Sequence, residues 1–253
     1  MKLIISLSLL VATVLSATVM TAKAQTPDKP LYEIRTYHCN EGKRPDLIAR
    51  FQNHTTRIFE NHGMENIGYW LSTENENDLI YILAFPNNTA RDAAWKDFIA
   101  DDEWKDVYAK SIANGKIVKN IDSEFLTLNP ELTKEIKTDS ELESPVFELR
   151  TYYCFPDKFP NIVARFRDHT RVLFEKHGMV NVAYFQTVKE DGSQPELKYI
   201  IAHKNMEAAK VSWDAFRNDP EWKKVAEASQ VDGKIVEKVV SVYMTALPFS
   251  DIK

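Results

Sequence analysis

Residues 33–39 of the chain read Glu-Ile-Arg-Thr-Tyr-His-Cys, and residues 148–154 read Glu-Leu-Arg-Thr-Tyr-Tyr-Cys. The second stretch follows the first by 115 residues. At the same offset, residues 50–64 align with residues 165–179, with nine of fifteen positions identical. A repeat of this length is too long for a solenoid and indicates a duplicated domain. Residues that both copies keep are needed either for the fold or for a site.

The first 24 residues differ from the rest of the chain. Lys2 is followed by an apolar run over residues 3–20 and then by Ala22-Lys23-Ala24, the pattern of a secretory signal peptide. We therefore expect residues 1–24 to be cleaved and the mature protein to be exported, to the periplasm or beyond. An uncleaved membrane anchor is the alternative. No later apolar run is long enough to span a bilayer, so we expect no stable membrane insertion after cleavage.

Charge and cysteine content limit the classes of function. The 253 residues carry a net charge of −5 without a Lys/Arg-rich run, which argues against a nucleic-acid partner. The two cysteines, Cys39 and Cys154, occupy matched positions. They could form one bridge in an oxidising compartment, or they could be separate thiols facing a common interior.

The periodicity of apolar residues predicts the same elements in both copies. In the first copy, strands are expected at residues 31–39, 67–72, 79–85 and 116–128, and helices from Pro45 to Gly63, over 89–100, and in a short segment capped by Asp101. The order β-α-β-β-α-β is that of a split βαβ, or ferredoxin-like, unit. The expected domains are residues 30–128 and 145–248, joined by a polar surface linker over residues 129–144.

Helices cover only one face of the sheet in such a unit, so the other face must be buried elsewhere. Two tandem units can bury these faces against each other. We therefore expect an α+β protein in which two ferredoxin-like units form one barrel, equivalent to a dimer fused in a single chain. A further homodimer is left open.

Alternation along the first strand of each copy separates an apolar face from a polar face. We expect the apolar face (Tyr32, Ile34 and Thr36 in the first copy) to lie under the helices. The polar face is then expected to point between the two sheets, and it carries Glu33, Arg35, Tyr37, Glu148, Arg150 and Tyr152. These residues either satisfy one another as Glu–Arg pairs that fix how the copies dock, or line a pocket for a small polar or anionic ligand.

Three histidines are candidates for acid–base chemistry. His54 and His169 occupy matched positions beside the apolar stripe of the first helix, and His203 ends a strand where the first copy has Phe85. The alternative is that they are structural residues. The spacing of eight between His54 and His62 does not match a helical zinc pair, so no metal site is expected.

Several motifs together resemble the NIPSNAP domain: Tyr32-Glu-Ile-Arg-Thr-Tyr37, Phe59-Glu-Asn-His-Gly63, Gly68-Tyr-Trp70 and the Asp-x-Glu-Trp block at residues 101–104. The second copy repeats them, except that Ala183-Tyr-Phe185 replaces Gly68-Tyr-Trp70. The resemblance implies the dimeric α/β-barrel superfamily, which includes cofactor-independent monooxygenases, haem-degrading enzymes, relatives of chlorite dismutase and proteins with no known activity. The NIPSNAP branch itself has no settled reaction.

These observations favour a small-molecule binding protein whose ligand lies between the sheets. The first alternative is an enzyme of the monooxygenase-like or haem-related type that uses the histidines. The second is a protein-interaction scaffold without a pocket. No phosphate-binding or nucleotide-binding motif is present, and no cofactor is assigned.

Overall fold

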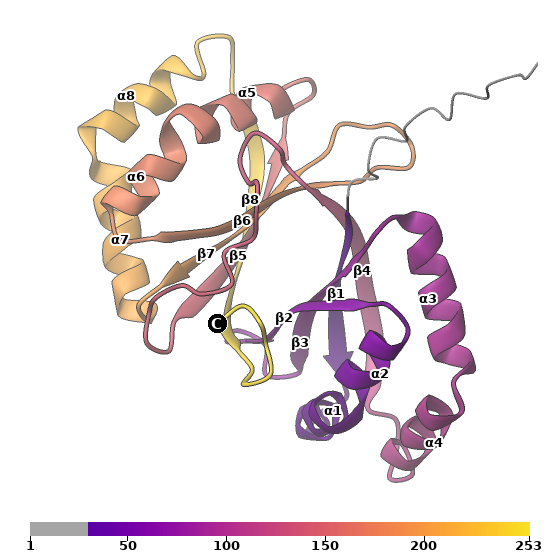
Figure 1. Ribbon diagram of the computed structural model, residues 1–253. Helices are drawn as coiled ribbons and strands as arrows, with labels where there is room; N and C mark the ends of the chain where they lie inside the picture. Colours follow the sequence, from indigo (N-terminus) through magenta and orange to yellow (C-terminus); the bar gives the residue numbers. More distant parts are fainter. Residues whose placement is uncertain (1–29) are drawn as a thin grey trace, which may run out of the picture.

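The structure, a computed structural model, describes residues 30–253. The expected signal peptide lies outside the described residues (Figure 1). Within them the chain forms an α+β fold in which eight antiparallel strands close into one barrel, which confirms the predicted α+β class and the predicted barrel. No helix in this part of the chain is long and apolar enough to cross a bilayer.

Each half contains four strands and two helical regions. The elements of the first half are β1 (Leu31–Cys39), α1 (Arg44–Arg50), the π-helical turn η1 (Phe51–Thr55), α2 (Thr56–Asn61), β2 (Glu65–Ser72), β3 (Asp78–Phe85), α3 (Asn88–Ala100), α4 (Asp102–Ser111) and β4 (Val118–Leu128). Those of the second half are β5 (Val146–Cys154), α5 (Phe159–Arg165), η2 (Phe166–Thr170), α6 (Arg171–Lys176), β6 (Val180–Thr187), β7 (Leu197–His203), α7 (Met206–Asn218), α8 (Pro220–Ala228) and β8 (Val236–Ala246).

The strand order in the barrel is β1-β3-β2-β8-β5-β7-β6-β4. Most pairing is within one half, and the halves join along short stretches at two seams. At one seam Trp70–Ser72 of β2 pairs with Met244–Ala246 of β8, and at the other Leu126–Leu128 of β4 pairs with Phe185–Thr187 of β6. Figure 1 shows the helices of the two halves on opposite outer sides of the strands.

The barrel interior is apolar, and this reverses the predicted orientation of the first strand in each half. Tyr32 and Ile34 of β1 share one buried cluster with Phe147 and Leu149 of β5, so these residues face the common interior. The opposite face of each strand lies under the helices of its own half. The prediction that the polar face points between the sheets is therefore wrong for all its members: Glu33, Arg35, Tyr37, Glu148, Arg150 and Tyr152.

The orientation is reversed because the buried carboxylate of β1 finds hydrogen-bond donors on the helical side of the sheet and not on the side of the facing sheet. Both faces of each sheet are buried, so alternation alone does not show which face lies inside. The facing sheet offers apolar side chains, whereas helix α3 offers the side chains of Arg91 and Trp95 to the carboxylate of Glu33. A buried carboxylate must face the side that can satisfy it.

The two cysteines are separate free thiols, and both are buried. Cys39 packs under the helices of the first half and Cys154 under those of the second half, so they do not share an interior. Burial raises the pKa of each thiol to about 11. Neither is therefore a ready nucleophile at neutral pH.

The segment between the halves is docked onto the barrel. Leu132 belongs to the core of the second half, and Ile136 and Leu142 pack against the interior cluster. The backbone N–H of Lys137 donates to the carbonyl of Val182 on β6, at 3.0 Å. These contacts hold the segment against the second half and the barrel interior.

One pair of positions shows how the two halves fill the same interior differently. A Cβ atom on Gly68 would lie 2.2 Å from the ring of Trp70, so the large indole requires glycine at this position. The second half has Ala183 and Phe185 at the equivalent positions, where the smaller ring leaves space for a methyl group.

We predict that Gly68→Ala lowers the free energy of unfolding by about 1–3 kcal/mol, because an overpacked core forces its neighbours from their preferred positions. Adding Trp70→Phe should recover most of this loss, since the double variant copies the second half. Urea denaturation of both variants and of Trp70→Phe alone measures the coupling. Equal stability of Gly68→Ala and wild type, or strictly additive losses, would contradict the packing argument.

Candidate functional site

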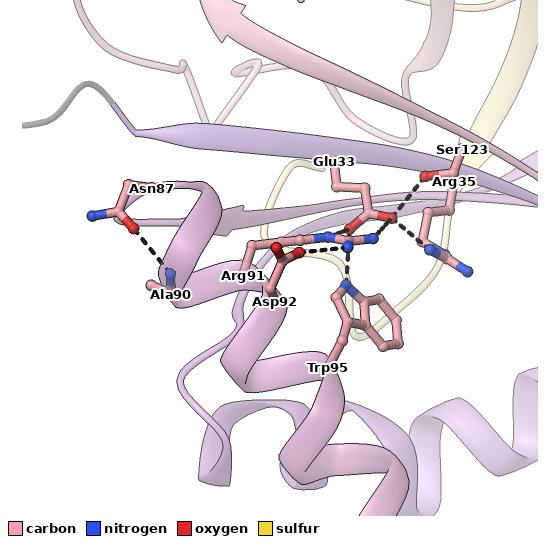
Figure 2. A network of polar contacts seen from close by, with 8 residues as sticks. All are labelled: Glu33, Arg35, Asn87, Ala90, Arg91, Asp92, Trp95 and Ser123. Carbon is pink, nitrogen blue, oxygen red and sulfur yellow. Dashed lines mark hydrogen bonds and ion pairs between the residues drawn. The ribbon is translucent and has the colours of Figure 1, made fainter. Parts of the chain in front are cut away.

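Glu33 is completely buried and lies at the centre of a polar network (Figure 2). Its carboxylate accepts hydrogen bonds from Arg35 (2.5 Å), Arg91 (2.9 and 3.0 Å), Trp95 (2.9 Å) and Ser123 (2.7 Å). Burial alone would raise the pKa of this carboxyl group, but the donors, led by Arg91 and Ser123, outweigh it and hold the pKa at about 2.

Glu148 occupies the equivalent position in the second half and is also completely buried. It accepts from Arg150 (2.5 Å), Trp213 (2.7 Å) and Ser241 (2.6 Å), and contacts Nε2 of His203 at 2.9 Å. Burial opposes ionisation here too, but the hydrogen bond to His203 and the charge of Arg150 bring the pKa to about 2.

Both networks connect the first strand of a half to its third helix and last strand. The predicted Glu–Arg pairing is present in each half, but both partners lie on the same strand, so the pair does not join one half to the other. Tyr37 and Tyr152 complete these cores by packing edge-on against Phe51 and Phe166. The carboxylates are already saturated with donors, which makes these networks structural.

The three candidate histidines do not come together. His203 is completely buried against Glu148, and its Nδ1 atom has no hydrogen-bond partner. His54 and His169 are exposed on the π-helical turns of the two halves and line two equivalent grooves. His62 and His177, at the ends of helices α2 and α6, contact the carboxylates of Asp101 and Asp219.

The grooves lie between the first and last helices of each half. The first-half groove has a volume of about 510 Å³, and its walls include Ala49, Arg50, His54, Asp106, Val107 and Ser111. The second-half groove has a volume of about 560 Å³, and its walls include Ala164, Arg165, His169, Lys224, Val225 and Ser229. These sets match position by position across the duplication, apart from Asp106 and Lys224.

A buried arginine lies in the wall of each groove. Arg50 is only 6% exposed to solvent, and Arg165 is only 8% exposed. Arg50 donates to the hydroxyl of Ser111 at 3.0 Å, and Arg165 donates to that of Ser229 at 3.3 Å. Among the described residues neither guanidinium has a carboxylate partner, and the Nε atom of each is buried without a hydrogen bond.

This arrangement leaves a buried positive charge unbalanced. Burial lowers the pKa of Arg50 and Arg165, yet a guanidinium stays protonated in proteins. The nearby partners are neutral, since each guanidinium packs over an indole ring, that of Trp104 at 5.3 Å or Trp222 at 5.2 Å. Buried charges are normally paired, so the geometry is suited to an anionic group entering the groove.

The repeated motifs build this wall. His62 contacts the carboxylate of Asp101 at 2.9 Å, and Asp101 caps helix α4 by accepting from the backbone N–H of Trp104 at 2.8 Å. The cap places the Trp104 indole beneath Arg50. The extra residue of the π-helical turn is stabilised by Thr55, whose hydroxyl donates to the carbonyl of Arg50 at 3.1 Å. Such turns are frequent at functional sites.

Sequence reasoning found His54 and His169 but missed the arginines beside them. A signal was present, because Arg50 and Arg165 open the most similar stretch of the two copies. No sequence pattern, however, shows that an arginine present in both copies is buried without a carboxylate partner. Among the described residues, no group of three or more His, Cys, Asp or Glu side chains could hold a metal ion.

We predict that Glu148→Gln lowers the free energy of unfolding at pH 7 by about 3 kcal/mol, because it leaves Arg150 buried and unpaired. A carboxylate with a depressed pKa stabilises the fold above the unfolded pKa near 4.5, and this contribution is lost as the pH falls toward 2. The loss caused by the variant should therefore shrink across that window. Asp214→Asn, which removes an exposed carboxylate, is the control; equal losses, or a loss independent of pH, would contradict the network.

The family and structural relationships agree with this architecture. A sequence profile of the NIPSNAP family matches twice, over residues 32–131 and residues 147–251. A candidate monooxygenase from Lactobacillus acidophilus NCFM has a similar structure, with a TM-score of 0.57 and 18% identity over 86% of this chain and 94% of that chain. Another, from Fusobacterium nucleatum, has a TM-score of 0.55 and 12% identity over 88% and 94%.

An uncharacterized NIPSNAP domain protein from Burkholderia xenovorans aligns over 38% of this chain and 90% of its own, with 22% identity and a TM-score of 0.34. No curated protein matches the chain significantly. Likeness at these identities shows the fold alone and does not assign a reaction. The two profile matches, in contrast, cover most of the sequence in tandem, and the chain belongs to the NIPSNAP family.

Proposed function

We propose that the protein binds small organic anions that carry a carboxylate, through the guanidinium groups of its two helical grooves. One observation supports this proposal above the others. In both halves an arginine is more than nine-tenths buried at the wall of an open groove and has no carboxylate partner within the described chain. A ligand carboxylate would supply the missing charge.

The surroundings of Arg165 suit such a ligand. A carboxylate can accept from two guanidinium nitrogens at once, and charge-assisted bonds of this kind are about twice as strong as neutral ones. Ser229 already holds one Nη atom in position. Ala164 and Val225 supply apolar wall beside the charge, the combination of few polar groups and apolar surface that is typical of ligand sites.

Small-molecule binding remains the proposed class of function, but its site lies in the helical grooves and not between the two sheets. The space between the sheets holds large, completely buried side chains, among them Trp70, Phe147 and Phe185. The ligand site is therefore assigned to the helical layer instead. Together with the export predicted from residues 1–24, the proposal describes a protein that meets its ligand outside the cytoplasm.

A second candidate function is acid–base catalysis on the bound anion. His169 is exposed in the same groove as Arg165, and its ring has no hydrogen-bond partner among the described residues. A free imidazole beside an anion site is suited to proton transfer. Turnover of a bound acid that falls at least tenfold in His169→Ala, with binding retained, would support this function; unchanged turnover would exclude it.

We predict that Arg165→Met together with Arg50→Met abolishes the thermal stabilisation that benzoate or pentanoate gives the wild-type protein. The ligand-free variant should be at least as stable as wild type, because replacing an unpaired buried charge by an apolar side chain of similar size is often neutral or stabilising. Thermal unfolding with increasing acid concentration, in chloride-free buffer, measures both effects.

Arg217→Met is the matched control, because Arg217 is exposed on helix α7 and paired with Asp214 outside the grooves. It should leave the stabilisation by the acids unchanged. Stabilisation that survives in the double groove variant would refute the proposed site. A marked loss of stability in the ligand-free variant would instead give the arginines a structural role.

A further inference from the structure

The second-half groove contains a second cation that the first-half groove lacks. Lys224, on helix α8, lines the same groove as Arg165. Its ammonium group forms no ion pair or hydrogen bond within the described part of the chain. An anion bound at Arg165 therefore has another unpaired positive charge available in the same groove.

Two substitutions between the halves create this difference. The first-half groove has Asp106 at the position of Lys224, and its carboxylate is bound by Lys110 at 2.6 Å. The second half has Ala228 at the position of Lys110. The exchange removes an internal ion pair and leaves one free ammonium group in its place.

The acidic side chains around the second-half groove do not neutralise the ammonium group of Lys224. Asp168 is paired with Arg167 at 2.7 Å, and Glu221 is paired with Lys176 at 3.1 Å. Asp232 also lines the groove, and its carboxylate has no cation partner among residues 30–253, but it lies beyond the end of α8. Lys224 lies in the middle of that helix, eight residues before Asp232, so a ligand that extends from Arg165 toward Lys224 leads away from Asp232.

We propose that the second-half groove binds dicarboxylic acids, with one carboxylate on Arg165 and the other on Lys224, whereas the first-half groove is limited to monocarboxylates. This inference rests on the proposed function and specifies its ligand class. The apolar body of the acid would lie against Val225 and Ala228, and the volume of about 560 Å³ is ample for a chain of several carbons.

Tryptophan side chains allow the two grooves to be followed separately. The chain has five tryptophans, and the indoles of Trp104 and Trp222 contact Arg50 and Arg165 respectively. In ¹⁵N-labelled protein, titration with glutarate should shift the Trp222 indole signal at a concentration at least tenfold lower than titration with pentanoate, which has the same chain length. Trp104 should show no such preference.

Reciprocal variants test the origin of the preference. Lys224→Gln should reduce the glutarate-to-pentanoate preference at Trp222 to less than threefold, while pentanoate affinity stays within about threefold of wild type. Asp106→Lys combined with Lys110→Ala should create a glutarate preference at Trp104. Indole signals of the unaffected groove show whether each variant is folded.

The outcomes separate this inference from the proposed function. If both acids bind at Trp222 with equal affinity, or if Lys224→Gln leaves the preference unchanged, the dicarboxylate assignment is wrong and carboxylate binding stands. If neither acid moves either indole signal, both proposals fall. If inorganic phosphate alone shifts Trp222, the groove binds a compact inorganic anion and the dicarboxylate assignment is again wrong.

Discussion

The carboxylates of Glu33 and Glu148 have no contact with solvent, and each depends on donors from the chain itself. Besides the arginine on the same strand, donors come from the third helix and the last strand of each half, so the charged face of the first strand must lie under the helices. The opposite face is then free to be apolar. Two such faces bury each other, and the closed barrel follows from this requirement together with the short seams between the halves.

The same physical rule identifies the unusual feature of the molecule. Glu33 and Glu148 are buried charges with complete sets of partners, as a stable fold requires. Arg50 and Arg165 are buried charges that contact hydroxyl groups and aromatic rings but no carboxylate of the described chain. Because duplication has kept both arginines in the walls of open grooves, the unbalanced charge is better explained by a ligand than by packing.

The order of elements could be predicted from the sequence because periodicity, capping residues and the internal repeat all act locally. Asp101, for example, caps the short helix predicted after it, and Asp219 caps the equivalent helix of the second half. Which face of β1 points into the barrel could not be predicted from the sequence. Both faces of the sheet are buried, so alternation separates the two faces without showing which one lies inside. The grooves could not be predicted from the sequence either, because the absence of a carboxylate near Arg165 depends on helices that meet only in the folded chain.

In the proposed binding mode, the guanidinium of Arg165 binds a ligand carboxylate in the second-half groove. The most direct measurement is a crystal structure of the protein grown with glutarate. We expect one carboxylate within hydrogen-bonding distance of Arg165 and the second near Lys224. A groove without glutarate, in a protein that binds glutarate in solution, would contradict this binding mode and locate the ligand site elsewhere in the molecule.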